Sequence, residues 1–156
     1  MNAPAVETVE TEAVPEEVMS LNHSRLIHRI SVALLPYEDR FDILPELEFE
    51  LKEGRLKPDV ALLPRQQYDY SRDLIRVLKP PVTAIEIHSP TQDFNALVAK
   101  ITDQYLPSGV LSAWLVLPIV RNIYVFLPGQ PPQVFSSGTL RDPATQIEIN
   151  LDTLFR

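Results

Sequence analysis

Cysteine is absent from the 156 residues of this chain, and its absence excludes two kinds of stabilising structure. Disulfide bonds and thiolate metal sites both require cysteine, so neither holds this fold together. A reducing compartment is the simplest setting for such a composition, and we expect the protein in the cytoplasm. The chain is long enough for one domain with a substantial core and too short for two comfortable domains.

Long apolar segments and glycine-rich loops are scarce as well. The longest apolar run, Val110 to Val120, is shorter than the roughly 20 residues that span a bilayer, and Arg121 follows it. The N-terminal residues include acids and no apolar signal core, so we expect neither secretion nor a membrane partner. Only four glycines occur, and none forms a phosphate-binding loop. A serine nucleophile elbow and a His/Cys cluster with metal-ligand spacing are also missing.

Positive charge is in deficit, because the chain has a net charge of −7 at pH 7. This balance argues against an extended nucleic-acid-binding surface. Five glutamates lie within residues 1–17, which contain no basic residue, so the remainder of the chain is close to neutral. Residues 52–79 hold seven basic residues against four acids, and this mildly basic stretch surrounds Asp59. This distribution of charge is therefore compatible with local binding of DNA.

Residues 1–19 differ from the rest of the chain in composition. They are rich in Ala, Val, Glu and Pro and show no sustained periodicity, which is typical of disordered segments. We therefore predict a disordered acidic tail over residues 1–19 and a single folded domain over residues 20–156.

Hydrophobic periodicity predicts a helix followed by a hairpin. Apolar residues recur at helical spacing from Ser20 to just before Pro36, and this proline ends the predicted helix. Residues 47–51 alternate apolar side chains with glutamates, as in a strand with one wet face. A turn at residues 53–54 would join this strand to a second one over residues 57–63.

A strand over residues 82–88 and a second helix follow a predicted loop over residues 64–81. Ser89 suits the N-cap of the helix, Gln92 would complete a capping box, and the helix ends at residues 107–109. Further strands are predicted over residues 111–117, 122–127 and 146–149. This order of elements implies an α/β fold, with helices packed around one mixed sheet.

Two acidic residues stand in strands that are otherwise apolar. Asp59 lies in the segment 57–63 and Glu86 in the segment 82–88. Burial normally excludes a carboxylate, since an unpaired buried charge is costly. Acids on two neighbouring strands can share one divalent cation, and Lys100 on the following helix could orient or activate a water. The combination suggests metal-assisted hydrolysis of a phosphodiester.

Several motifs around these residues occur together in a known order. They are Pro-Asp-Val at 58–60, Glu-Ile-His-Ser-Pro-Thr at 86–91, Lys100, Tyr105, Gly-Val at 109–110 and Trp-Leu-Val-Leu-Pro at 114–118. Together they resemble the bacterial family of proposed restriction endonucleases usually called Uma-two, which is similar in fold to the PD-(D/E)xK nucleases. The resemblance covers about residues 20–156.

The resemblance implies a restriction-endonuclease-like core and a metal-dependent nuclease that acts on DNA. Asp59 would match the first acid of the motif and Glu86 the second. Together with the carbonyl of Ile87 they would hold Mg²⁺ or Mn²⁺. His88 stands two residues after Glu86, where the motif normally has its lysine. Lys100 would take the place of that lysine, or His88 would position the nucleophile instead.

Each main candidate also has an ordinary structural interpretation. Asp59 could be an acid beside a turn at the start of an edge strand. Glu86 could pair with Arg25 or Arg29 on the first helix. Lys100 lies about 120° from the centre of the apolar stripe of its helix, where a solvated lysine would also lie. It can reach the acids only if its helix returns across the sheet on their side.

Other polar residues are open to similar alternatives. His88 could be a structural residue at the entry to the helix, and His23 fits a core or boundary position on the apolar face of the first helix. The glutamates within residues 46–50 are typical of a solvated strand face, although one of them could add a ligand. Trp114 is expected in the core.

The sequence thus favours a metal-dependent DNA endonuclease. A homodimer would place two sites about a two-fold axis, which suits cleavage of both strands of a duplex. The acidic net charge and the missing motif lysine support a different function, that of an inactive nuclease-fold domain used for binding or assembly. A hydrolase of some other phosphodiester is a third possibility for which the residues offer no positive sign.

Overall fold

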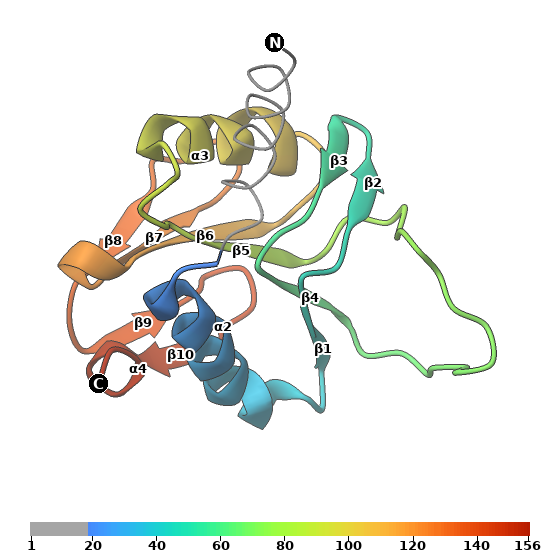
Figure 1. Cartoon of the computed structure of the whole chain (residues 1–156), viewed down its shortest axis with the longest axis horizontal. Helices are drawn as coiled ribbons and strands as arrows, with labels where there is room; N and C mark the ends of the chain where they lie inside the picture. The colour runs from blue at the N-terminus through green and yellow to red at the C-terminus, as the bar shows by residue number, and fades with distance from the viewer. Residues whose placement is uncertain (1–18) are drawn as a thin grey trace, which may run out of the picture.

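The computed structural model describes residues 19–156, and one mixed sheet forms its centre (Figure 1). In spatial order its strands are β1 (Phe41–Pro45), β4 (Val60–Pro64), β5 (Thr83–Ile87), β6 (Ser112–Leu117), β7 (Asn122–Phe126) and β8 (Gln133–Phe135). Strands β5 and β6 are parallel, and every other neighbouring pair in this sheet is antiparallel. The predicted mixed sheet is therefore confirmed.

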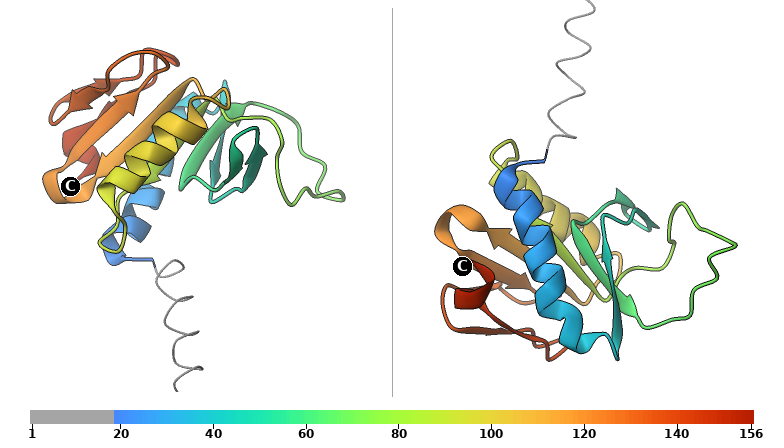
Figure 2. Two further views of the ribbon diagram at one scale, coloured as in Figure 1. Left: turned by 90° about the horizontal axis from the view of Figure 1, so that it is seen from above. Right: turned by 60° about the horizontal axis from the view of Figure 1, so that its bottom comes forward.

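Helices cover the two faces of this sheet. Helix α2 (Leu21–Leu34) packs on one face, and α3 (Phe94–Lys100), continued by the π-helical turn η2 (Ile101–Tyr105), packs on the other (Figures 1 and 2). Successive side chains of β5 alternate between the two layers, so that Ile85 and Ile87 face α2 while Ala84 faces α3. The fold is the predicted α/β domain with helices flanking the sheet.

Helix α2 matches the sequence pattern closely. Its buried residues Leu26, Ile30 and Leu34 are four apart, so they form one stripe along the helix. The hydroxyl of Ser20 caps the helix by accepting a hydrogen bond from the His23 amide at 3.2 Å.

The C-terminal segment adds to the layer that contains α2. Strands β9 (Thr139–Arg141) and β10 (Glu148–Asn150) form a hairpin, and α4 (Leu151–Leu154) follows it. Their apolar residues join the same core cluster as α2. Two short 3-10 turns, η1 (Leu35–Tyr37) and η3 (Pro118–Val120), complete the elements of the described residues.

The predicted hairpin is present, but its second strand was assigned wrongly. Strand β2 (Phe49–Leu51) pairs with β3 (Gly54–Leu56), and Gly54 makes the turn with a φ of 134°, a value that side chains disfavour. The strand that follows Asp59 is not part of this hairpin. It is β4, which pairs with β1, a strand that the sequence analysis did not predict.

The second helix begins later than predicted. Residues 89–92 form a turn, and α3 starts after Asp93, whose carboxylate accepts a hydrogen bond from the Ala96 amide at 3.2 Å. Half of the expected capping box still forms, because the amide of Ser89 donates to the side-chain oxygen of Gln92 at 3.1 Å.

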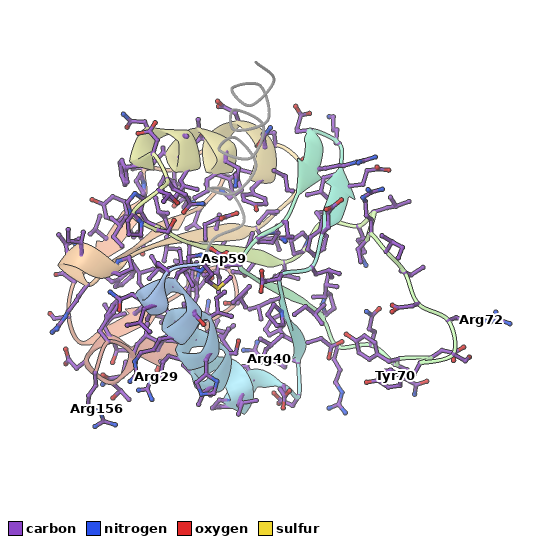
Figure 3. The ribbon with its side chains drawn as sticks, in the orientation of Figure 1. Arg29, Arg40, Asp59, Tyr70, Arg72 and Arg156 are labelled. Carbon is purple, nitrogen blue, oxygen red and sulfur yellow. The ribbon has the colours of Figure 1, made fainter. Side chains whose placement is uncertain are left out.

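A long loop joins the end of β4 to the start of β5 and projects from the sheet, as predicted for residues 64–81. Figure 3 shows Tyr70 and Arg72 on this projection, far from Asp59 near the middle of the molecule. Of the predicted tail, all but Met19 lies outside the described residues. None of the helices in residues 19–156 has the length and apolar character needed to span a membrane.

Candidate active site

A cavity of about 750 Å³ opens at the end of the sheet where β4 begins and β5 ends. The hairpin β2–β3, the helix α3 and the N-terminal end of α2 each contribute residues to its walls. Its ionisable lining residues are the acids Glu46, Asp59 and Glu86 and the bases His23, Arg55, Lys57 and Lys100. The cavity therefore unites three of the four predicted catalytic side chains.

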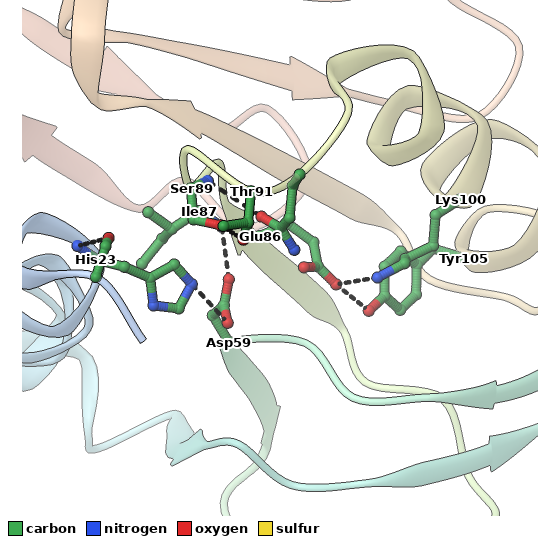
Figure 4. A network of polar contacts seen from close by, with 10 residues as sticks. His23, Asp59, Glu86, Ile87, Ser89, Thr91, Lys100 and Tyr105 are labelled. Carbon is green, nitrogen blue, oxygen red and sulfur yellow. Dashed lines mark hydrogen bonds and ion pairs between the residues drawn. The ribbon is translucent and has the colours of Figure 1, made fainter. Parts of the chain in front are cut away.

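Glu86 lies in the middle of the polar network shown in Figure 4. Strand β5 places it against α3, and only 2% of the residue is exposed. The hydroxyl of Tyr105 donates a hydrogen bond to Glu86 Oε2 at 2.5 Å, and Lys100 Nζ lies 3.6 Å from the same oxygen. Burial raises the pKa of Glu86 to about 7, Lys100 opposes this increase, and Asp59 adds to it.

Lys100 and Tyr105 reach the same oxygen because the helix is π-helical between them. Residues five apart in an α-helix point about 140° away from each other. In η2 the amide of Leu106 instead donates to the carbonyl of Ile101 at 3.0 Å, an i to i+5 bond. This wider turn brings both side chains to the Glu86 carboxylate. Lys100 therefore lies beside the acids, as it must if it takes part in catalysis.

Asp59 is held from two layers of the molecule. Its Oδ2 accepts a hydrogen bond from the Ile87 amide at 2.7 Å, and its Oδ1 lies 3.1 Å from His23 Nε2 (Figure 4). The hydrogen bond to Asp59 raises the pKa of His23, and burial of the ring opposes this. These two contacts fix the orientation of the Asp59 carboxylate beside Ile87, the residue that follows Glu86.

His23 and Tyr105 are site residues that the sequence analysis did not assign. His23 was interpreted as a core or boundary histidine, and Tyr105 was named among the motifs of the resemblance. Both are buried, and each contacts one of the two acids. The residues themselves offered one sign of this role, which is that His23 and Tyr105 each place a polar group on an apolar helix face.

Among the described residues, the His88 ring forms no hydrogen bond or ion pair with Asp59 or Glu86. Its Nε2 is 3.0 Å from the carbonyl oxygen of Gln92, so the ring bridges the turn between β5 and α3. Within the described part of the chain it is not among the residues that line the cavity. This contact fits the structural alternative for His88 better than the positioning of a nucleophile.

The three glutamates of residues 46–50 differ in their surroundings. Glu48 forms an ion pair with Arg76, and Glu50 forms one with Arg55 at 3.3 Å. Glu46 lines the cavity and has a φ of 54°, a left-handed value uncommon for residues other than glycine. Of the three, only Glu46 lines the cavity, and within residues 19–156 it does not form a three-residue metal site with the two acids.

The arginines proposed as partners of Glu86 bind elsewhere. A guanidinium nitrogen of Arg25 donates to the carbonyl of Arg156 at 2.8 Å, and Arg29 donates to the carbonyl of Thr153 at 2.5 Å. Both therefore join α2 to the C-terminal segment. That interpretation of Glu86 was wrong, since its partners are Lys100 and Tyr105.

The atoms that Asp59 and Glu86 offer to a metal are carboxylate oxygens, the ligands that Mg²⁺ and Mn²⁺ prefer. Glu86 Oε1 accepts no hydrogen bond from the described residues, and each oxygen of Asp59 accepts only one. Within residues 19–156, no three His, Cys, Asp or Glu side chains are close enough to hold a metal by themselves. The residues fit a cation held by two carboxylates and completed by water, a carbonyl or substrate oxygens.

Comparison with known proteins assigns the sequence to a family. The sequence model of the Uma2 family, described as putative restriction endonucleases, matches residues 2–153. The chain belongs to the Uma2 family. The match spans the predicted domain up to residue 153 and also takes in most of the acidic N-terminal segment.

A solved structure supports the fold of this Uma2 member. It is a putative nuclease belonging to DUF820 from Anabaena variabilis ATCC 29413, with a TM-score of 0.71 and 21% sequence identity. The likeness covers 88% of this chain and 82% of that protein. Among curated proteins the search found no match. The likeness shows that the two proteins share a fold.

Proposed function

We propose that this Uma2 member is a metal-dependent endonuclease that hydrolyses phosphodiester bonds in DNA. The observation that carries the proposal is the position of Lys100, whose ammonium lies 3.6 Å from Glu86 in the cavity that also contains Asp59. The two acids and a lysine are the groups that the PD-(D/E)xK motif requires. The lysine comes from α3 because His88 occupies its usual place in sequence.

Asp59 and Glu86, with the carbonyl of Ile87, would hold Mg²⁺ or Mn²⁺. A bound divalent cation supplies Lewis acidity and lowers the pKa of a coordinated water. Lys100 would orient the attacking water and stabilise the negative charge that develops on the phosphate. His23 and Tyr105 would act through the acids, since their hydrogen bonds keep both carboxylates in place.

The alternative, an inactive domain used for binding or assembly, draws support from the missing motif lysine and the acidic charge. The position of Lys100 weakens the argument from the missing motif lysine, because its ammonium lies beside Glu86 in place of that lysine. The basic residues Arg55 and Lys57 on the cavity wall weaken the second, because the charge near the site is mixed. The geometry therefore favours an enzyme.

A plasmid-nicking assay with Mn²⁺ tests the proposal. The wild-type protein should convert supercoiled plasmid to the nicked form, and chelation by EDTA should stop the reaction. Asp59→Ala should lose activity because it removes one of the two carboxylate ligands. Asp39→Ala, which removes an exposed acid that does not line the cavity, is the matched control and should remain active. Nicking that survives in Asp59→Ala would contradict the assigned site.

A further inference from the structure

Two basic side chains lie along the cavity wall that leads away from Asp59. Arg55 lies on β3 and Lys57 directly follows this strand, four and two residues before Asp59. Both line the cavity, and Lys100 lines it from α3. Figure 2 shows the hairpin β2–β3 next to α3, on the same side of the sheet.

Arg55 and Lys57 are two residues apart, at the end of β3, and both line the cavity. Side chains alternate along an extended chain, and Leu56 between them is buried in the core that includes α3. A fully extended chain rises about 3.3 Å per residue, so Lys57 lies at most about 7 Å from Asp59 along the chain and Arg55 at most about 13 Å, because the chain bends at Asp59. The two cations therefore form a short row that begins beside the acids.

The hairpin is a firm support for this row. Its turn is tied to the end of the helix layer, because the amide of Glu53 donates to the hydroxyl of Ser108 at 3.2 Å. On the other edge, the amide of Glu50 donates to the carbonyl of Val77 at 2.9 Å, and Phe49 is fully buried. Groups on such a support can be placed precisely relative to Asp59.

Both basic groups are available to a ligand. Arg55 is paired with Glu50 at 3.3 Å, but the two side chains are 61% and 47% exposed, and an exposed pair of this kind contributes little stability. Lys57 is exposed and forms no ion pair with the described residues. A phosphate that enters the cavity can therefore engage both cations at small cost.

We propose that Arg55 and Lys57 bind backbone phosphates of the strand that is cut, on one side of the scissile phosphate. One strand of a duplex has a phosphate about every 3.4 Å along its axis, so cations within about 13 Å of Asp59 face phosphates within a few nucleotides of the cut. The substrate is then a nucleic acid strand that extends past the scissile bond, rather than an isolated phosphodiester. This inference rests on the proposed nuclease function and assigns it a direction of substrate binding.

The test compares two substrates and a matched control variant. Arg55→Ala and Lys57→Ala are assayed with Mn²⁺ on bis(p-nitrophenyl) phosphate, which has a single phosphodiester, and on a labelled DNA oligonucleotide. Lys52→Ala is the control, because Lys52 is exposed in the turn of the same hairpin and does not line the cavity. Binding of the oligonucleotide is measured by fluorescence anisotropy with Ca²⁺ over a range of salt concentrations.

Each cavity variant should lower kcat/KM for the oligonucleotide about tenfold, mainly through KM, as expected for one lost charge-assisted hydrogen bond. Hydrolysis of bis(p-nitrophenyl) phosphate should stay within about twofold of wild type, because that substrate does not extend to the row. The slope of log affinity against log salt should become shallower by about 0.7 for a single strand or 0.9 for a duplex. Lys52→Ala should match wild type in all three measurements.

Other outcomes separate the failure of this inference from the failure of the proposed function. If wild type cleaves DNA and the variants match Lys52→Ala, or if both substrates are affected equally, the phosphate-binding row is wrong and the nuclease stands. If wild type cleaves neither substrate but the variants have a shallower salt dependence of binding, the proposed nuclease function is wrong, and the binding of phosphates by Arg55 and Lys57 is supported. If wild type binds no oligonucleotide at any salt concentration, the row is overturned.

Discussion

Glu86 and Asp142 show how differently two buried acids can be used in one small domain. Asp142 is fully buried and accepts hydrogen bonds from Ser112 Oγ at 2.6 Å and Trp114 Nε1 at 2.9 Å. The Ala144 amide donates to its other oxygen at 2.8 Å, so neutral donors satisfy both oxygens. Glu86 instead contacts the ammonium of Lys100 and lines the cavity. This combination, rather than burial alone, marks Glu86 as a candidate for a catalytic role.

Replacement of Lys100 separates catalysis from metal binding. We expect Lys100→Ala to lower Mn²⁺-dependent cleavage by about two orders of magnitude or more, since it removes a group that positions water or stabilises charge. The affinity for Mn²⁺ should stay close to that of wild type, because Lys100 is not a ligand. Cleavage rates and calorimetric titration together check this prediction, with the exposed Lys79→Ala as the control. Normal cleavage by Lys100→Ala would remove the lysine from the mechanism.

The sequence located the acids of the site more readily than the residues that hold them. Asp59 and Glu86 stand out because each interrupts an apolar strand. Lys100 was a weaker candidate from the residues alone, since its position on the helical wheel also suits a solvated lysine, and the resemblance strengthened it. His23 and Tyr105 contact the acids across the packed layers, over sequence separations that no local pattern reveals.

At the level of elements, the helix formed by α3 and η2 decides the geometry of the site. The extra residue in its π-helical turn directs Tyr105 and Lys100 to Glu86 Oε2. Such turns are rare and frequently lie at functional sites. A π-helical turn interrupts the regular hydrogen bonds of an α-helix. In this chain it brings Tyr105 and Lys100 into contact with Glu86.

A change at Tyr105 tests whether the helix stabilises the charged form of Glu86. Tyr105→Phe keeps the packing of the ring and removes the hydrogen bond at 2.5 Å to the carboxylate. We expect a loss of about 1–3 kcal/mol in the free energy of unfolding at pH 8, where Glu86 is ionised, and a smaller loss at pH 5. Urea denaturation at the two pH values measures both losses. Equal losses would mean that Tyr105 supports only the packing.

Local patterns predicted some elements well and others poorly, for identifiable reasons. Helix α2 has a cap, a regular apolar stripe and a terminating proline, and it forms as predicted. Strand β1 was not predicted because its five residues neither alternate nor form a continuous apolar run. Its partner is β4, so the strand depends on pairing with a distant segment. The start of α3 moved because Asp93 competes successfully with Ser89 as the N-cap.

The site is a property of the whole molecule, because its parts come from all three layers. His23 comes from the helix on one face of the sheet, Glu86 from the sheet itself, and Lys100 from the helix on the other face. The order of elements in the sequence indicated a mixed sheet, but the neighbours of each strand follow from long-range packing. The site residues could therefore be named only as candidates before the fold was known.

The stability of the metal-free protein should depend on pH. The pKa of Glu86 is about 7 in the fold and 4.5 for the free group, so the folded form retains a proton that the unfolded chain has lost. Stability should then fall as pH rises from 4.5 to 7, by about 3 kcal/mol for this group alone. His23 acts in the same direction, because its raised pKa gives stability below pH 6.5 that is lost as pH rises through its folded value.

Denaturation with urea across this pH range measures the effect. Glu86→Gln cannot ionise, so its stability should change much less between pH 4.5 and 7 than that of wild type. A divalent cation that binds only the folded form should restore stability to wild type at pH 8 and do little for the variant. An identical pH dependence in the two proteins would show that Glu86 is not the titrating group.

Calorimetric titration with Mn²⁺ tests the central claim most directly, because it reports on Asp59 and Glu86 without requiring catalysis or DNA. Wild type should bind Mn²⁺ at a single site, and both Asp59→Ala and Glu86→Gln should lose most of this affinity. Asp39→Ala should bind as wild type does. Binding that persists in both site variants, or no binding by wild type, would contradict the claim that these two carboxylates form a metal site.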